Sequence, residues 1–294
     1  MKIVRTAQAL SQWRSACPDD VGFVPTMGGL HEGHLALFAK ARTRHHVVVA
    51  SIYVNPLQFG PQEDFGAYPR TEAADAKKLE AAGVDALFLP SDAEVYPHGR
   101  AQQTQVRVPR LSEDLCGRYR PGHFEGVTTV VARLFGLVRP RAAYFGKKDY
   151  QQWRIIERMV VDLGLTVEVV GMETVRTTDG LALSTRNQYL SPEGRQKASG
   201  LYATLSAGVG LVRSGVSPSE VEKTCHDRLA SLGFVPDYVA IRRAFDLVIP
   251  TPEDQDLVIL AAARLQGTRL IDNQEFSRPL RADGGNLQSS RKPG

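Results

Sequence analysis

Short apolar runs that do not alternate with polar residues constrain the fold of this chain more than any other feature. Residues 21–26 (VGFVPT) and 46–54 (HVVVASIYV) are such runs, and residues 32–44 between them have the apolar spacing of a helix. A strand that is apolar on both faces needs helices on both sides, as in a parallel sheet, whereas a one-faced antiparallel sheet would alternate. The sequence therefore predicts a doubly wound α/β domain that begins with a βαβ unit.

The same alternation of elements continues to about residue 174, where the texture of the sequence changes. Further predicted elements of the first domain (1–174) are helices near 71–82, 126–138 and 149–163 and strands at 84–90, 142–146 and 165–171. A polar, turn-rich connector follows, and then helices near 191–213 and 217–231 and strands at 237–245 and 256–265. We expect a smaller α+β domain over 175–282 and a frayed, polar, glycine-rich tail over 283–294.

Composition narrows the class of protein. The net charge is +4, but no run of five or more Lys or Arg occurs, which argues against a nucleic-acid-binding arm. The chain has an odd number of cysteines: Cys17, Cys116 and Cys225. Because they are far apart and lack C-x-x-C spacing, the sequence predicts neither a disulfide framework nor a zinc site. It predicts instead a protein of the reducing cytoplasm. No segment approaches the roughly 18 apolar residues of a membrane span.

The stretch 25–34 (PTMGGLHEGH) lies where the first predicted strand turns into a helix. Ligands of open parallel sheets bind beyond the carboxyl ends of the strands, where a helix start offers free N–H groups and a positive dipole end to an anion such as phosphate. Gly28 and Gly29 let the backbone come close, and His31 and His34 are three residues apart and share one helix face. Two imidazole donors there can stabilise charge on a phosphoryl group. A zinc pair or two ordinary surface histidines are the alternatives.

Three later stretches place polar side chains at loops near the same edge. Asn55 and Gln58 could hydrogen-bond a hydroxylated carboxylic acid, but they could equally pack the loop. After Gly146, the residues Lys147 and Lys148 could offer a mobile cation, with Asp149 as cap of the next helix, although lysine pairs are common on surface loops. Residues 184–186 (STR) could close over a triphosphate, although S-T-R is weak as a lone motif.

Taken together, six ordered motifs resemble the pantoate–β-alanine ligase family over roughly residues 1–275. They are PTMGGLHEGH, YVNPLQF, YPRT, RPGHFEGV, FGKKDYQQ and LSTRNQYL. The first is similar to the HxGH signature of class I nucleotidyltransferases. The resemblance implies a Rossmann-like fold and a cytoplasmic homodimer. It also implies ligation in two steps, in which pantoate and Mg²⁺-ATP give a pantoyl adenylate and pyrophosphate, and β-alanine then displaces AMP to give pantothenate.

The resemblance also implies residue roles. The implied catalytic residues are His34, which is the family's proton donor, His31, Lys148 and Arg186. The implied pantoate-binding residues are Gln58 and Gln152, with Asn55 beside them. Gln58 would also contact β-alanine. The implied ATP site consists of Met27, Gly28, Gly29, Leu30, His31, Glu32, Gly33, His34, Gly146, Lys147, Lys148, Asp149, Val175, Leu183, Ser184, Thr185 and Arg186.

Two departures from the family pattern stand out. The usual M-S-S-R is here L-S-T-R, in which Leu183 keeps the bulk and Thr185 keeps the hydroxyl group. The usual G-A-L-H is here G-G-L-H, and Gly29 is expected to loosen the ATP loop slightly. Two other functions fit the same motifs less well: a nucleotidyltransferase that acts on a small alcohol phosphate, and a nucleotide-binding regulatory module without turnover.

Overall fold

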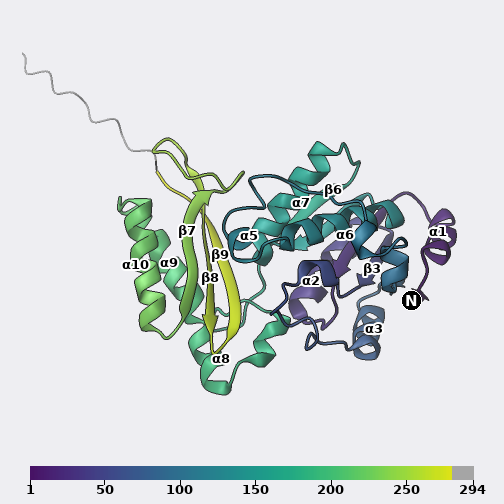
Figure 1. The fold of residues 1–294 in the computed structure, drawn as a ribbon, viewed down its shortest axis with the longest axis horizontal. Coiled ribbons are helices and arrows are strands. Elements are labelled where there is room, and N and C mark those ends of the chain that lie inside the picture. The colour runs from purple at the N-terminus through teal and green to yellow at the C-terminus, as the bar shows by residue number, and fades with distance from the viewer. Residues whose placement is uncertain (280–294) are drawn as a thin grey trace, which may run out of the picture.

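The computed structural model describes residues 1–279 and contains two sheets (Figure 1). The larger sheet has six strands in the order β1-β4-β3-β2-β5-β6, and every neighbouring pair is parallel. Its strands are β1 (Lys2–Val4), β2 (Val21–Thr26), β3 (Val47–Ile52), β4 (Ala86–Phe88), β5 (Ala142–Gly146) and β6 (Glu168–Met172). This sheet confirms the predicted doubly wound α/β fold. The tail predicted at 283–294 lies outside the described residues.

Helices cover both faces of the parallel sheet, as its apolar strands require. The helices of this unit are α1 (Ala7–Ser15), α2 (Glu32–Arg44), α3 (Glu72–Ala81), α4 (Asp92–Val95), α5 (Cys116–Tyr119), α6 (His123–Val138) and α7 (Tyr150–Asp162), with 3-10 turns η1 (Pro56–Gln58), η2 (Arg100–Gln102) and η3 (Lys147–Asp149). In β3, Val48 and Ala50 join the core formed with α2 and α3, whereas Val49 joins the core formed with α6 and α7. Successive strand residues thus serve opposite faces.

The sheet has a topological switch point between the neighbouring strands β2 and β5, where the chain connections change direction. From β2 the chain moves to β3 on one side, and β5 lies on the other side. In open α/β sheets, a crevice for ligands forms at such a switch point, beyond the carboxyl ends of the strands. Thr26 and Gly146 end these two strands, so the segments that follow them are brought together.

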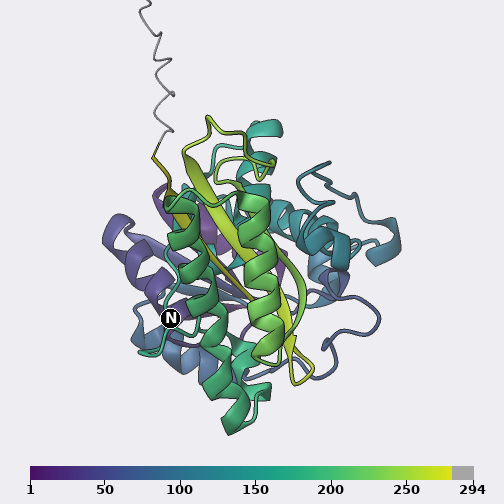
Figure 2. The ribbon, with the colours of Figure 1, turned by 90° about the vertical axis from the view of Figure 1, so that its left-hand side faces the viewer.

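The smaller sheet is antiparallel and lies between two helical layers (Figures 1 and 2). It consists of β7 (Val235–Arg243), β8 (Asp256–Leu265) and β9 (Thr268–Ser277), preceded by η4 (Thr185–Tyr189), α8 (Pro192–Ala198), α9 (Gly200–Arg213) and α10 (Pro218–Ser231). Ile259 faces the core shared with α9 and α10, whereas Val258 and Leu260 join the core of α6 and α7. The division of the chain at residue 174 stays a prediction.

Five helices and strands were not predicted from the sequence, and one predicted helix is wrong. The additional elements are β1, α1, α4, α5 and β9. The polar run Asp272, Asn273, Gln274 in the centre of β9 hid its strand pattern. The helix predicted over 191–213 is two helices that meet at Ser199 and Gly200. Paired Ser and Gly residues commonly break a helix, and a side chain at position 200 would also crowd Leu232.

Candidate active site

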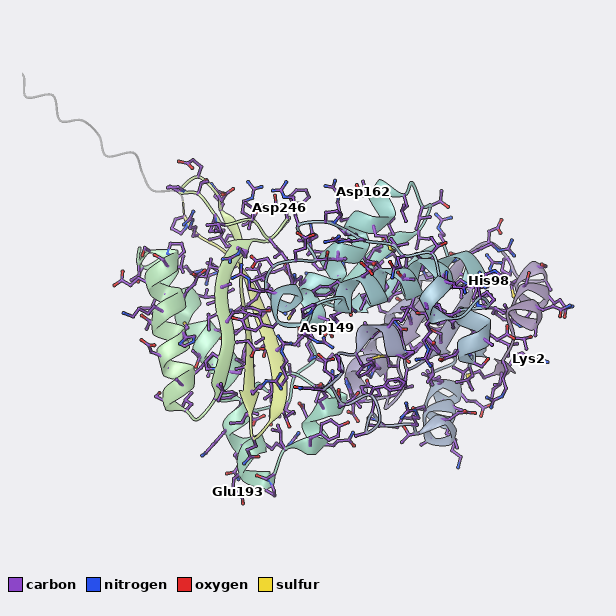
Figure 3. The ribbon with its side chains drawn as sticks, in the orientation of Figure 1. Lys2, His98, Asp149, Asp162, Glu193 and Asp246 are labelled. Atoms are coloured by element: carbon purple, nitrogen blue, oxygen red, sulfur yellow. The ribbon has the colours of Figure 1, made fainter. Side chains whose placement is uncertain are left out.

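A cavity of about 220 Å³ opens beyond the carboxyl ends of β2 and β5. Asp149, which lies between the two units in Figure 3, is on its wall. The predicted residues that line the cavity are Met27, His31, Gly33, His34, Gln58, Gly146, Lys148, Asp149, Gln152, Val175, Leu183, Ser184, Thr185 and Arg186. Those that do not are Gly28, Gly29, Leu30, Glu32, Asn55 and Lys147. The fold therefore gathers most of the predicted site from five separated segments.

The two histidines form a reciprocal cap at the start of α2. His31 is the N-cap residue, and its Nδ1 accepts a hydrogen bond from the Gly33 amide at 3.1 Å. His34 Nδ1 accepts one from the His31 amide at 3.3 Å, and the ring centroids are 4.1 Å apart. Because each Nδ1 is an acceptor, the neutral form of each ring carries its proton on Nε2. Both rings can therefore donate an Nε2–H to an anion.

Burial keeps both rings uncharged near neutral pH. It lowers the pKa of His34 to about 3, with a further contribution from neighbouring His31. Burial also lowers the pKa of His31 to about 4, and the positive charge of Lys148 acts in the same direction. A neutral imidazole in a partly buried cavity is a fixed hydrogen-bond donor of the kind that stabilises developing charge without reorganising.

The backbone amides that precede α2 are not free, which corrects one expectation. Asp75, which is 1% exposed, accepts hydrogen bonds from the amides of Gly29 and Leu30, both at 2.9 Å. The amides of His31 and Gly33 are bonded to the two rings. These four groups are already satisfied, so side chains must supply most of the donors to a bound anion. The expected loosening by Gly29 stays a prediction, and the hydrogen bond from its amide to Asp75 opposes it.

Lys148 and Lys147 have different surroundings. Lys147 Nζ lies 2.7 Å from carboxylate oxygens of both Glu173 and Glu275, outside the cavity lining. Lys148 Nζ lies in the cavity, 3.7 Å from Asp149 Oδ2. Burial alone would raise the pKa of Asp149, but the charges of Lys148, Arg186 and other nearby cations together outweigh it, and the pKa is lowered. Asp149 occupies the N-cap position of α7 but makes no capping hydrogen bond, contrary to expectation. Lys148 is thus the lysine available to a ligand.

The segment around η4 forms a further wall of the cavity and contacts the segment that carries the histidines. Thr185 Oγ1 donates to the Gly29 carbonyl at 3.2 Å. Arg186 donates to Asp64 through Nε at 2.9 Å and through Nη2 at 2.7 Å. Burial alone would lower the pKa of Arg186, but the hydrogen bonds and charge of Asp64, together with the charge of Asp149, outweigh it and raise the pKa. This wall is joined to the parallel-sheet unit through side chains.

Gln58 is held by a second network. Asn55, 1% exposed, donates to Gln58 Oε1 at 3.1 Å and to the Gly126 carbonyl at 3.0 Å, so Asn55 packs the loop. Gln58 Nε2 points to Met27 Sδ at 3.0 Å. His123 Nδ1 lies 2.7 Å from the Gln58 carbonyl, which makes this nitrogen the donor, and burial lowers the pKa of His123 to about 3. Gln58 therefore presents an oriented amide to the cavity.

An apolar wall completes the cavity. This wall consists of side chains of α6 that line the cavity: Val127, Val130, Val131 and Leu134. Sequence reasoning did not identify this wall, nor did it identify Asp64, Asp75 or His123. The amphipathic helix was predicted, but which of its apolar residues face a cavity depends on the tertiary arrangement. The adjacent acids Glu63 and Asp64 in the 51–71 loop were the one available signal for the ion pair to Arg186.

Clusters of metal-binding side chains and membrane-spanning helices are two further features that bear on the class of protein. Within residues 1–279, no group of three or more His, Cys, Asp or Glu side chains is placed to hold a metal ion. Among the helices of the same residues, none has the length and apolar character needed to cross a membrane.

The fold and the cavity define an α/β enzyme of the Rossmann-like, HxGH nucleotidyltransferase type. The sequence profile described as pantoate-beta-alanine ligase matches residues 2–275. The chain is 52% identical over 279 residues to the pantothenate synthetase of Chromobacterium violaceum, which covers 95% of this chain and 100% of that protein. The chain belongs to the pantoate–β-alanine ligase family.

Solved structures agree with this assignment. The crystal structure of pantothenate synthetase from Thermus thermophilus is similar with a TM-score of 0.88 and 49% identity, covering 95% of this chain and 100% of that one. A pantoate-beta-alanine ligase from Francisella tularensis, complexed with beta-gamma ATP and beta-alanine, gives a TM-score of 0.80 at 31% identity, with 93% and 97% covered.

Proposed function

We propose that this chain joins pantoate to β-alanine in two steps driven by ATP. A pantoate carboxylate oxygen attacks the α-phosphorus of ATP, the bond from this phosphorus to the bridging oxygen breaks, and pyrophosphate leaves. The β-alanine nitrogen then attacks the acyl carbon of the pantoyl adenylate, loses a proton, and AMP leaves. Family membership and the bound molecules of the Francisella tularensis ligase support these substrates.

One observation supports this reaction above all: a single cavity holds donors suited to phosphate beside a pocket suited to a small branched acid. Lys148, Arg186 and the Nε2–H groups of His31 and His34 serve the phosphates. Gln58 and Gln152 offer uncharged amides to the pantoate hydroxyl and carboxylate groups. The valines and leucine of α6 suit the dimethyl group of pantoate.

The residue roles follow from charge and position. In the first step negative charge grows on the bridging oxygen and on the α-phosphoryl oxygens, and Lys148 with the two imidazoles neutralises it. His34 acts as a donor through Nε2–H, since its lowered pKa keeps the ring neutral. Gln58 and Gln152 align the pantoate carboxylate with the phosphorus, so positioning rather than a covalent nucleophile lowers the barrier.

Magnesium enters this scheme as part of the substrate Mg²⁺-ATP. Mg²⁺ usually keeps several waters and binds through substrate phosphates and one or two carboxylates. Asp149 and Glu173 are carboxylates on the cavity wall, and Glu173 is already paired with Lys147. Asp149 is paired more loosely, at 3.7 Å from Lys148 Nζ, and is therefore the carboxylate on this wall better suited to contact the hydrated ion.

We also propose a cytoplasmic homodimer. The resemblance to the family suggests the dimer, and large apolar side chains on one side of the molecule support it. Val161, Phe245 and Ile249 are 75%, 76% and 70% exposed and line one surface depression. Light scattering at several protein concentrations tests the dimer.

The test of the reaction incubates the chain with Mg²⁺-ATP, pantoate and β-alanine and omits each in turn. Mass spectrometry should find pantothenate and AMP only when all three are present. With β-alanine omitted, pyrophosphate and pantoyl adenylate should form at about the level of the enzyme. Pyrophosphate with no amide under any condition would favour a different nucleotidyltransferase, and ATP binding without any product would favour a regulatory module.

A further inference from the structure

Two adjacent acids in the loop after η1 each pair with an arginine, and one of these arginines, Arg186, lines the cavity. Glu63 pairs with Arg120, which donates from Nε at 2.7 Å and from Nη2 at 2.6 Å. Asp64 pairs with Arg186 from the other side, again through Nε and Nη2. The Glu63 pair supports the Gln58 loop, because Arg120 Nη2 also donates to the Gln58 carbonyl at 3.2 Å. The Asp64 pair crosses to the η4 wall, 122 residues further along the chain.

The pairing with Asp64 uses only one edge of the Arg186 guanidinium. Nε and Nη2 form that edge, and Nη1 makes no hydrogen bond with any of residues 1–279. The side chain lines the cavity and is 27% exposed. A guanidinium has five donors in a fixed fork, so an acid on one edge leaves the other edge free for a second anion.

Two aromatic rings lie near the guanidinium, and a neighbouring contact holds the segment that carries it. The Arg186 Cζ lies 5.7 Å from the ring centre of Tyr68 and 6.0 Å from that of Phe59. Tyr189, at the end of η4, donates to the Ala67 carbonyl at 3.2 Å. Both contacts tie η4 to the loop that carries Asp64. The guanidinium is therefore oriented before any ligand arrives.

We propose that Asp64 is a positioning residue for Arg186, holding one guanidinium edge so that the Nη1 edge faces the phosphates of ATP. This inference rests on the proposed function, which places the triphosphate in this cavity. An arginine that is already oriented loses less side-chain entropy when phosphate binds. Asp64 itself contacts no substrate, and its effect passes through Arg186.

The test is a double-mutant cycle of Asp64→Asn and Arg186→Ala, read by calorimetric titration with Mg²⁺-ATP alone and by steady-state kinetics. Asp64→Asn should weaken ATP binding and raise the KM for ATP about tenfold, while the KM for pantoate stays within about twofold. In the Arg186→Ala background, Asp64→Asn should change ATP binding by less than about twofold. Asp64→Glu should restore part of the affinity, because it keeps the carboxylate.

A matched control is Glu168→Gln, which removes an ion pair with Arg44 of 2.8 Å at the amino end of β6, whereas the cavity lies beyond the carboxyl ends of the strands. Its ATP binding should equal that of the unchanged protein. Thermal unfolding shows whether Asp64→Asn folds. If it does not, a second cycle combines Asp64→Glu with Arg186→Lys. In this cycle Asp64→Glu should change ATP binding only when Arg186 is present.

The outcomes separate the two proposals. If the unchanged protein makes no AMP from the three substrates, the proposed function fails. If it makes AMP but Asp64→Asn weakens ATP binding equally with and without Arg186, the positioning role fails. Tighter ATP binding in Asp64→Asn would also overturn it, because Asp64 would then compete with phosphate for Arg186.

Discussion

The two walls of the cavity are built by different means. The histidine wall, residues 26–34, is held by backbone groups and by buried Asp75, over a short stretch of chain. The η4 wall is held by side chains that contact distant segments, chiefly Arg186 to Asp64 and Thr185 to Gly29. The first wall therefore depends on one buried carboxylate and on hydrogen bonds within its own stretch, whereas the second depends on side chains that reach segments 122 and 156 residues away.

The largest effect is expected from Asp75→Ala, which breaks the histidine wall at its support. Two amides and the Thr71 hydroxyl, at 2.9 Å, would lose their acceptor. We expect the free energy of unfolding to fall by roughly 2–4 kcal/mol, since buried donors would lose their partner. Adenylate formation should slow about 100-fold, because the rings would shift. Urea unfolding and single-turnover kinetics measure these effects, and Asp227→Ala, a change at an exposed acid, is the control. An unchanged free energy of unfolding would show that Asp75 does not support this wall.

The second-largest effect is expected on the rate of adenylate formation when a donor to the phosphates is removed. His34→Ala and Lys148→Ala should each slow adenylate formation more than about tenfold, since one positioned donor or charge is commonly worth a few kcal/mol. Neither change should alter folding greatly. Rapid-quench measurement of pyrophosphate release checks the rates, and His46→Ala, an exposed histidine just after α2, is the control. Rates equal to those of the unchanged protein would exclude these roles.

The contrast between the walls also explains what the sequence could predict. The apolar runs predicted the parallel sheet, and the strand ends brought His31, His34 and Lys148 to one edge. Their partners could not be predicted, because Asp75 and Asp64 meet their donors only through tertiary packing, 45 and 122 residues away in sequence. The free amides expected at the start of α2 were wrong partly for the same reason, since Asp75 accepts from two of them, and partly because the two histidine rings accept from the others. Strand β9 was not predicted because a core position in it carries a charged residue, Asp272, which is buried and pairs with Arg176.

A smaller effect is expected from pH, and it should act on the histidine side of the cavity. The pKa values of His31, His34 and His123 are lowered from 6.5 to between about 3 and 4. Between these values and 6.5 the unfolded chain binds more protons than the folded one, so stability falls as the pH falls through 6.5. Glu63, whose pKa is lowered to about 2, loses its contribution only below about 4.5.

Thermal unfolding should therefore have a midpoint several degrees lower at pH 5 than at pH 7.5. His123→Asn should reduce this pH dependence, because one of the three rings is removed, whereas exposed His46→Asn should leave it unchanged. An equal pH dependence in His123→Asn would mean that the buried ring takes up a proton in the folded state.

The smallest expected effect sharpens the comparison, because it lies where the walls touch. Gly29 has φ +63°, and a Cβ there would lie 2.6 Å from the Thr185 methyl carbon. The two departures from the family pattern are therefore in contact, and the methyl of Thr185 occupies space that an alanine at position 29 would need. Gly29→Ala should destabilise the chain through both the clash and the left-handed backbone. Thr185→Ser keeps the hydroxyl bond and should be nearly neutral. Combined, the two changes should cost about 1 kcal/mol less than their sum in urea unfolding, whereas additive costs would show that the walls tolerate these residues independently.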